Sequence, residues 1–311
     1  MMRPERAKEI LFNTFMKTFK TLFFLLFICL IGTTQAKAMG IKDAGEGKFE
    51  LIEGDLVMVV DAAHGGKILS FTFKGAEVIS QSRWPESFGS TFWTSPQVEW
   101  NWPPVPEYDK QPYTVEQTAD RLILTSQVSE KLKFRIRKEF ASNTKKKCFV
   151  ITYSIINEDN KERQVAPWEI TRVTNDEGLI FFDAKAEEIT PAGVLDFKPA
   201  YKAVWYHTDV TNENRKINAD GKGWLAFCGN GLLLVKKFDD LNPSQPAPKE
   251  AEIQVYVNRG KSYIELESQG AYQTLKPGES LSMTVRWMMT AVDDTPQPSK
   301  KLLKTVKKML K

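Results

Sequence analysis

The sequence predicts an all-β fold, a large antiparallel sandwich with one short helix at its C-terminus. Apolar and polar residues alternate with period two in many short stretches, as they do in half-buried strands. Gly, Pro, Asn and Asp interrupt these stretches at short intervals, which is typical of turns between strands. Long amphipathic helical patterns are missing before the last dozen residues. These three observations favour one β domain over residues 37–298.

Residues 1–36 are expected to be a secretory signal peptide, with Met16 as the possible true start. Two lysines precede the apolar run 22–32, and small residues follow it, so cleavage after Ala36 or Ala38 fits the pattern. The apolar run is about eleven residues long, whereas a membrane-spanning helix needs roughly 20. We therefore expect the protein to be exported, either to the periplasm or out of the cell.

The strand predictions rest on alternation along the chain. Leu132, Phe134 and Ile136 alternate with basic residues in 131–140, which predicts a strand with one wet face, and 148–157 repeats the pattern. Further strands are predicted at 55–61, 67–73, 121–127, 223–229, 231–238, 251–257, 262–268 and 282–292. Ten or more strands in a body of this size indicate a single sandwich with long connections left over for a binding face.

The last residues, 299–311, are predicted to form a basic amphipathic helix. Leu302, Leu303 and Val306 fall on one helical face, and lysines occupy the other. Such a helix either caps the sandwich or contacts a membrane surface or a partner protein. Both interpretations remain open at this point.

The charge distribution argues against nucleic acid as a partner. The chain carries a formal net charge of +4, but residues 1–36 contribute +3 and residues 299–311 contribute +6. The body, 37–298, is therefore at −5, and binding to phosphates needs a basic face. Two histidines and no CxxC pair give no pattern for a metal site, so no metal and no other cofactor is expected. Cys148 and Cys228 each sit in apolar alternation, which favours buried thiols, although export would permit a disulfide.

The aromatic segment 89–104, GSTFWTSPQVEWNWPP, is the first candidate binding site. Its rings lie between Gly and Pro residues, and polar side chains stand among them. Flat rings match the C–H faces of a pyranose, and amides and carboxylates bind its hydroxyls. The alternative is that the rings are simply core. The candidate binding residues here are Phe92, Trp93, Gln97, Glu99, Trp100 and Trp102.

Three further segments contribute candidates. In VAPWEITRV, Trp168, Glu169 and Arg172 are candidate binding residues, with a structural salt bridge between the last two as the alternative. His64 follows a strand and precedes two glycines, and His207 lies among aromatic residues and an aspartate. Either histidine is a candidate acid, or else a packing residue.

Glu265 and Glu267 lie on one side of the predicted strand 262–268, at period two. Two carboxylates on one face repel each other, and this costs free energy unless water solvates them, a cation pairs with them or they serve in proton transfer. Crowding would raise the pKa of one of them into the range useful for proton transfer. They are the candidate catalytic base, and a solvated strand face is the alternative.

Four segments in this order resemble the galactose-mutarotase-like superfamily, and more narrowly exported bacterial proteins of the DUF4380 type: VDAAHGGKILSFTFKGAEVI, GSTFWTSPQVEWNWPP, FVITYSIINEDNKERQVAPWEITRV and LKPGESLSMTVRWMM. The resemblance implies a β-supersandwich with a sugar-binding cleft on a concave face. It also implies a late-strand glutamate as base, at Glu265 or Glu267, and a histidine as acid. That acid would be His207 or His64, because the family's usual position holds Trp168 and Glu169 here.

Three functions follow as hypotheses. The first is an exported, non-catalytic carbohydrate-binding protein that takes a mono- or oligosaccharide. The second is an enzyme of the aldose 1-epimerase type, which uses the late glutamate and a histidine. The third is a structural envelope protein that uses its basic tail as a contact. In the sugar-phosphate epimerases of this superfamily a basic, Gly-rich segment stands where the aromatic segment stands here, and the aromatic segment has no arginine. The resemblance therefore implies a sugar without a phosphate group.

Overall fold

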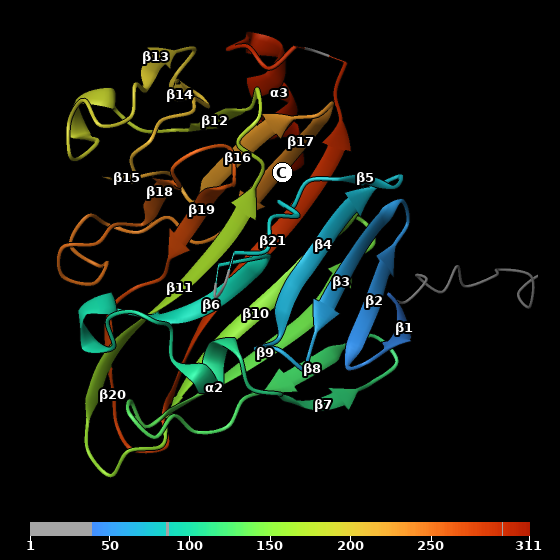
Figure 1. The fold of residues 1–311 in the computed structure, drawn as a ribbon, viewed down its shortest axis with the longest axis vertical. Coiled ribbons are helices and arrows are strands. Elements are labelled where there is room, and N and C mark those ends of the chain that lie inside the picture. Colours follow the sequence, from blue (N-terminus) through green and yellow to red (C-terminus); the bar gives the residue numbers. More distant parts are fainter. Residues whose placement is uncertain (1–38, 85–86, 294) are drawn as a thin grey trace, which may run out of the picture. The chain divides into compact units, whose positions relative to one another are not determined.

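Two antiparallel sheets make up the fold in the computed structural model, which describes residues 39–84, 87–293 and 295–311 (Figure 1). The predicted signal peptide lies outside the described residues. Among the described residues, the first sheet has 11 strands, with β5 (Ala76–Glu77) paired to β4 and β20 (Gln273–Leu275) paired to β11. Its main path is β1 (Gly40–Gly45), β2 (Lys48–Glu53), β3 (Leu56–Asp61), β4 (Lys67–Phe73), β6 (Ser90–Ser95), β11 (Arg163–Val173), β19 (Ile264–Gln269), β18 (Ile253–Val257) and β15 (Arg215–Ala219).

The second sheet has 10 strands within the described chain and contains the long pair β10 and β21. Its order is β13 (Lys198–Ala200), β14 (Ala203–His207), β12 (Leu179–Phe182), β16 (Trp224–Gly229), β17 (Leu232–Lys237), β21 (Ser280–Ala291), β10 (Cys148–Asn157), β9 (Phe134–Asn143), β8 (Leu122–Thr125) and β7 (Thr114–Gln117). The helical elements in the part of the chain that the structure describes are η1 (Gln97–Glu99), α2 (Pro106–Asp109), η2 (Ala186–Glu188) and α3 (Lys300–Met309). No helix in the described part of the chain is long and apolar enough to cross a membrane.

Aromatic contacts join the two sheets face to face. Phe92 on β6 stacks on Tyr153 of β10 with ring centroids 4.5 Å apart. Phe71 on β4 packs edge-on against Phe149 of β10 and Trp287 of β21, at 5.9 and 5.5 Å. Side chains alternate between the two faces of a strand, so these rings define the inner faces of both sheets. The predicted all-β antiparallel sandwich is confirmed.

The predicted strands appear in this sandwich, and the aromatic segment 89–104 differs in part from expectation. It is not wholly irregular, because Ser90–Ser95 forms the buried central strand β6. Cys148 and Cys228 are both buried and are not joined by a disulfide, which confirms the favoured interpretation as buried thiols. They lie on β10 and β16, which β17 and β21 separate in the second sheet.

The C-terminal helix is present as predicted. Leu302, Leu303 and Val306 of α3 are buried against the core. Ser299 caps the helix, since its side chain accepts a hydrogen bond of 3.1 Å from the Leu302 N–H. The apolar face of α3 therefore packs on the sandwich.

A buried ion pair crosses the space between the sheets. Lys236 on β17 donates to Glu169 on β11, and both side chains are fully buried. The Lys236 ammonium also donates to the Thr171 hydroxyl at 2.8 Å, and Glu169 accepts from Thr171 and Ser268. Burial lowers the pKa of Lys236, and the charge of Glu169 opposes that shift. Each charge thus depends on the other because water is excluded from both.

We predict that Lys236→Met lowers the free energy of unfolding by roughly 3–5 kcal/mol, because Glu169 then stays buried without its cation. Urea unfolding followed by tryptophan fluorescence measures the loss. The double variant Lys236→Met/Glu169→Gln should recover most of it, since glutamine is uncharged and can still bond Thr171 and Ser268. A single variant as stable as the wild type would contradict the prediction.

Candidate functional site

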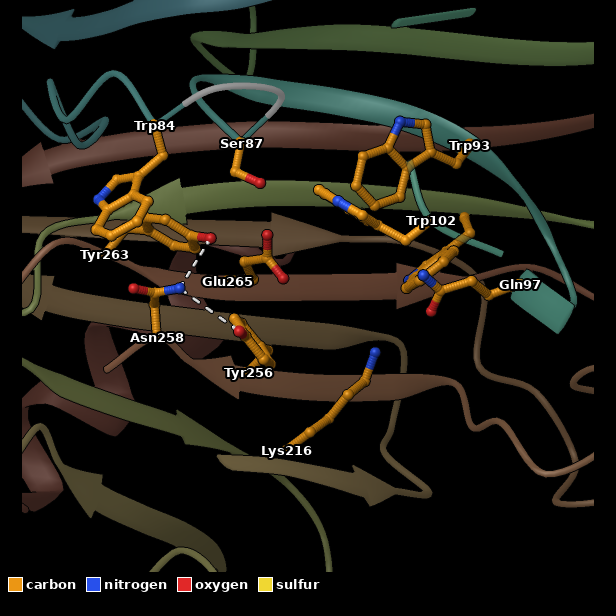
Figure 2. A pocket seen from close by; sticks show the side chains of 11 residues that line it. Trp84, Ser87, Trp93, Gln97, Trp102, Lys216, Tyr256, Asn258, Tyr263 and Glu265 are labelled. Atoms are coloured by element: carbon orange, nitrogen blue, oxygen red, sulfur yellow. Dashed lines mark hydrogen bonds between the residues drawn. The ribbon is translucent and has the colours of Figure 1, made fainter. Parts of the chain in front are cut away.

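A cleft of about 640 Å³ lies over the first sheet. Glu169 and Thr171 of β11 point between the sheets, so their neighbours Trp168 and Arg172 point out of the opposite face, where the cleft lies. Figure 2 shows Trp93, Trp102 and Gln97 at one end and Trp84, Tyr263 and Asn258 at the other. The lining residues are Trp84, Ser87, Trp93, Gln97, Trp102, Trp168, Lys216, Tyr256, Asn258, Tyr263 and Glu265.

Strand register builds one transverse row across the cleft. Arg172 on β11 pairs with Glu265 on β19, Glu265 with Tyr256 on β18, and Tyr256 with Lys216 on β15. Paired residues in neighbouring strands point to the same face, so β11, β15 and the consecutive strands β18 and β19 place their side chains together. The row therefore depends on every pairing between β11 and β15.

A cluster of indole rings forms one wall. The Trp93 ring lies edge-on to those of Trp102 and Trp168, with centroids 6.2 and 5.5 Å away. Two buried carboxylates hold these rings in place. Trp93 Nε1 donates to Asp109 and Trp168 Nε1 donates to Glu267, at 2.9 and 2.8 Å. The wall is rigid because each of these two indoles is fixed by packing and by a hydrogen bond.

The carboxylate that faces the cleft, Glu265, is charge-compensated. Arg172 Nη2 lies 2.7 Å from Glu265 Oε1, and the guanidinium is buried. Its central carbon lies over the rings of Trp93 and Tyr263, at 5.7 and 5.5 Å from their centroids. Cation–π contacts of this kind hold the arginine behind the cleft surface. Glu265 consequently presents oxygens to the cleft without an unpaired negative charge.

The second late carboxylate, Glu267, is fully buried beneath the lining. Its Oε2 accepts from Trp168 and from Lys216, the latter at 2.9 Å, and the Lys216 ammonium also lies over the Trp168 ring. Burial raises the pKa of Glu267 to about 7, which the Lys216 charge opposes and the Glu265 charge reinforces. Glu267 Oε1 has no hydrogen-bond partner among the described residues. A carboxyl in this state changes protonation near neutral pH.

Polar groups complete the opposite end. The Asn258 amide donates to the hydroxyls of Tyr263 and Tyr256, at 3.1 and 3.5 Å (Figure 2). Asn258 Oδ1 accepts from Ser262 at 2.6 Å, which fixes the amide orientation. Burial raises the pKa of Tyr256 to about 12, so its hydroxyl stays protonated. Each tyrosine oxygen accepts from Asn258, which leaves its own proton to be donated elsewhere.

Some predicted binding residues converge on the cleft. Trp93, Gln97, Trp102, Trp168 and Glu265 line it. Of the other predicted residues, Arg172 and Glu267 lie directly behind this lining, as described above. The remaining predicted residues are Phe92, Glu99, Trp100, Glu169, His64 and His207, which are not among the lining residues.

Four of these have other contacts. Phe92 stacks in the core between the sheets. Trp100 is buried behind the wall, where its Nε1 donates to the Thr94 carbonyl at 2.8 Å. Glu99 lies 3.6 Å from Arg163. The salt bridge expected between Glu169 and Arg172 does not form, because residues three apart in a strand point to opposite faces.

The two histidines lie on other elements. His64 follows β3 and is exposed, with Nδ1 2.9 Å from Asp61 Oδ2. His207 ends β14 of the second sheet and is also exposed. Neither lines the cleft. Their proposed role as acid stays a prediction.

Sequence reasoning missed Trp84, Ser87, Lys216, Tyr256, Asn258 and Tyr263. Tyr263 could have been predicted, because it lies two residues before Glu265 in the predicted strand and therefore points to the same face. Lys216 carried no such signal, since only the pairing of β15 with β18 brings it to the cleft.

We predict a pH dependence of stability that comes from Glu267. Glutamate in an unfolded chain loses its proton near pH about 4.3, whereas burial holds the pKa of Glu267 at about 7 in the folded state. The folded state binds more protons between these values, so the free energy of unfolding falls as pH rises through them, by roughly 4 kcal/mol. Urea unfolding at several pH values should show this fall in the wild type and a flatter profile in Glu267→Gln. Other titrating groups cancel in the comparison, and parallel profiles would contradict the prediction.

Comparison with known proteins gives structural matches. No family model and no curated protein matches the sequence. A galactose mutarotase-like protein from Clostridium acetobutylicum matches with a TM-score of 0.55 and 11% identity, over 82% of this chain and 100% of that one. A galactose mutarotase related enzyme from Lactobacillus acidophilus matches with a TM-score of 0.52 and 10% identity, over 80% and 99%. A proposed aldose 1-epimerase from Escherichia coli K12 matches with a TM-score of 0.58 and 13% identity, over 82% and 100%. The chain has the fold of galactose mutarotase-like and aldose 1-epimerase-like proteins.

Proposed function

We propose that the protein binds a mono- or oligosaccharide in the cleft. The observation that carries the proposal is the lining of the cleft, in which indole and phenol rings surround hydrogen-bonding side chains. The cleft has a volume of about 640 Å³. This volume falls in the range of small-molecule sites. The fold likeness to galactose mutarotase-like proteins, whose name refers to a sugar, supports the same ligand class.

The rings at the rim are exposed where packing alone would bury them. Trp102 is 55% exposed and Trp84 is 41% exposed, although both are large and apolar. An exposed apolar surface of this kind marks an interaction site. Flat rings suit the C–H faces of a sugar ring, and the fixed Trp93 and Trp168 extend the same wall inward.

The charges of the cleft favour a neutral ligand. Each lining charge has an opposite partner, Lys216 with Glu267 and Glu265 with Arg172. An anionic ligand would meet two carboxylates, and a cationic one would meet two basic groups. Gln97, Asn258 and the paired ions instead offer donors and acceptors that suit hydroxyl groups. Neither a sugar phosphate nor a nucleic acid fits this arrangement.

Trp102→Ala should weaken sugar binding roughly thirtyfold, because truncation of an aromatic anchor in a site costs about 2 kcal/mol. Saturation-transfer NMR against a panel of monosaccharides and short glycans measures binding. The control is Val98→Ala, which removes an exposed apolar side chain of η1 that does not line the cleft. Equal affinity in both variants, or no binding of any glycan by the wild type, would count against the sugar site.

A second candidate function is acid–base chemistry of the aldose 1-epimerase type. The observation that favours it is Glu267, a buried carboxyl with a pKa of about 7 and an oxygen without a partner in the described chain. Such a group can take and return a proton near neutral pH. Lys216 and Trp168 cover it, so a ligand reaches it only when Lys216 moves. Glu265 is the carboxylate that already faces the cleft.

If the protein is an enzyme of this type, Glu267→Gln should slow the interconversion of α and β anomers by at least about a hundredfold and leave sugar binding intact. Exchange NMR on the same sugars measures the rate. Glu252→Gln is a matched control, because Glu252 is also buried with a pKa raised to about 7 and does not line the cleft. Equal losses in both variants would indicate a folding effect. No acceleration by the wild type would leave binding as the function.

Export and the DUF4380 resemblance belong to the proposal and rest on the sequence alone. The residues that predict export, 1–36, lie outside the described part of the chain. A structural role in the cell envelope remains the third hypothesis. It depends on the basic tail and not on the cleft.

A further inference from the structure

Two basic segments meet at the end of α3. The turn between β9 and β10 carries Lys145, Lys146 and Lys147, all exposed. We call these residues, together with the exposed lysines of the tail, the lysine surface. The tail contributes Lys300, Lys301, Lys304, Lys307, Lys308 and Lys311.

Hydrogen bonds hold the two segments against each other. Lys146 Nζ donates to the Lys311 carbonyl at 2.7 Å, and Lys237 Nζ on β17 donates to the Leu310 carbonyl at 2.9 Å. Cations at the C-terminal end of a helix stabilise its unsatisfied carbonyl groups. This structural role accounts for Lys146 and Lys237. It does not account for exposed lysines such as Lys145, Lys147 and Lys304.

The two segments of the lysine surface carry no acidic residues of their own. Neither residues 141–148 nor residues 299–311 contain an acidic side chain. Glu53 and Asp55 lie close by, in a hollow that Lys146 and Lys147 also line. Glu53 accepts from Ser142 and Asp55 lies 3.8 Å from Lys74, so both have other contacts. Clustered lysines repel one another, and an anionic surface would relieve that repulsion.

The helix cannot bind a membrane by inserting its apolar face. Leu302, Leu303 and Val306 are buried in the sandwich, and insertion would expose the core that they cover. The lysines point away from that face. Contact through α3 as it stands is therefore electrostatic.

We propose that the lysine surface docks the folded protein on an anionic phospholipid bilayer. The body, residues 37–298, carries −5, so an anionic surface repels most of the protein and attracts this face. Each lysine near such a surface strengthens partitioning roughly fivefold. The proposal is independent of the cleft.

The test is co-sedimentation of the full chain with vesicles of equal parts phosphatidylglycerol and phosphatidylcholine. Neutral phosphatidylcholine vesicles give the binding that does not depend on lipid charge. Lys304→Gln/Lys307→Gln/Lys308→Gln should lower partitioning to the anionic vesicles about a hundredfold. The control Lys42→Gln/Lys222→Gln/Lys261→Gln removes the same charge from exposed lysines that each have an acidic neighbour. It should lower partitioning far less.

A second variant guards against unfolding of α3. Lys145→Gln/Lys147→Gln leaves the helix intact and should still lower partitioning about twenty-fivefold. A higher salt concentration should lower the partitioning of the wild type to anionic vesicles towards that of the variants. The proposal would be overturned if the triple variant of the lysine surface and the control triple variant lost equal amounts of partitioning. It would also be overturned if the wild type showed no preference for anionic vesicles. Equally tight binding to a DNA duplex would also overturn it, because the surface would then bind polyanions in general.

Discussion

The alternation of side chains along β11 is the constraint on which core and cleft both depend. Glu169 and Thr171 point to the second sheet, where Lys236 joins them, while Trp168 and Arg172 point to the cleft. A slip of one residue would exchange the two faces and turn Glu169 and Thr171 away from Lys236. The buried ion pair therefore specifies the register that also aligns the row from β11 to β15.

Glu265 and Glu267 lie two residues apart on β19, and they have different chemical roles because one lies at the cleft surface and the other beneath it. Glu265 reaches the cleft surface with a guanidinium against it, and Glu267 lies beneath an indole and an ammonium group. The same residue type thus serves as a hydrogen-bond acceptor at the surface and as a titrating group below. A ligand that drew Lys216 away would leave Glu267 with less compensation and favour its protonation.

The sandwich and its terminal helix were predictable because alternation and turn residues are local signals. The site was predictable only in part. Glu265 and Trp168 stood out by residue type, whereas Lys216 reaches the cleft only through the pairing of β15 with the distant strand β18. Phe92 and Trp93 show what the sequence could not predict. These adjacent residues of one strand point to opposite faces, Phe92 to the core and Trp93 to the cleft. Composition alone does not say which face of the strand is buried in the core.

Adjacent lysines on β17 connect the interior with the tail. Lys236 points inward to the ion pair, and Lys237 donates to the carbonyl of Leu310, the residue that follows α3. The hydrogen bond between β17 and the tail therefore forms only when β17 has its native register. The position of the last dozen residues is thereby tied to the register of the second sheet. A protease that trims a loose C-terminus would in this way distinguish properly folded molecules from misregistered ones.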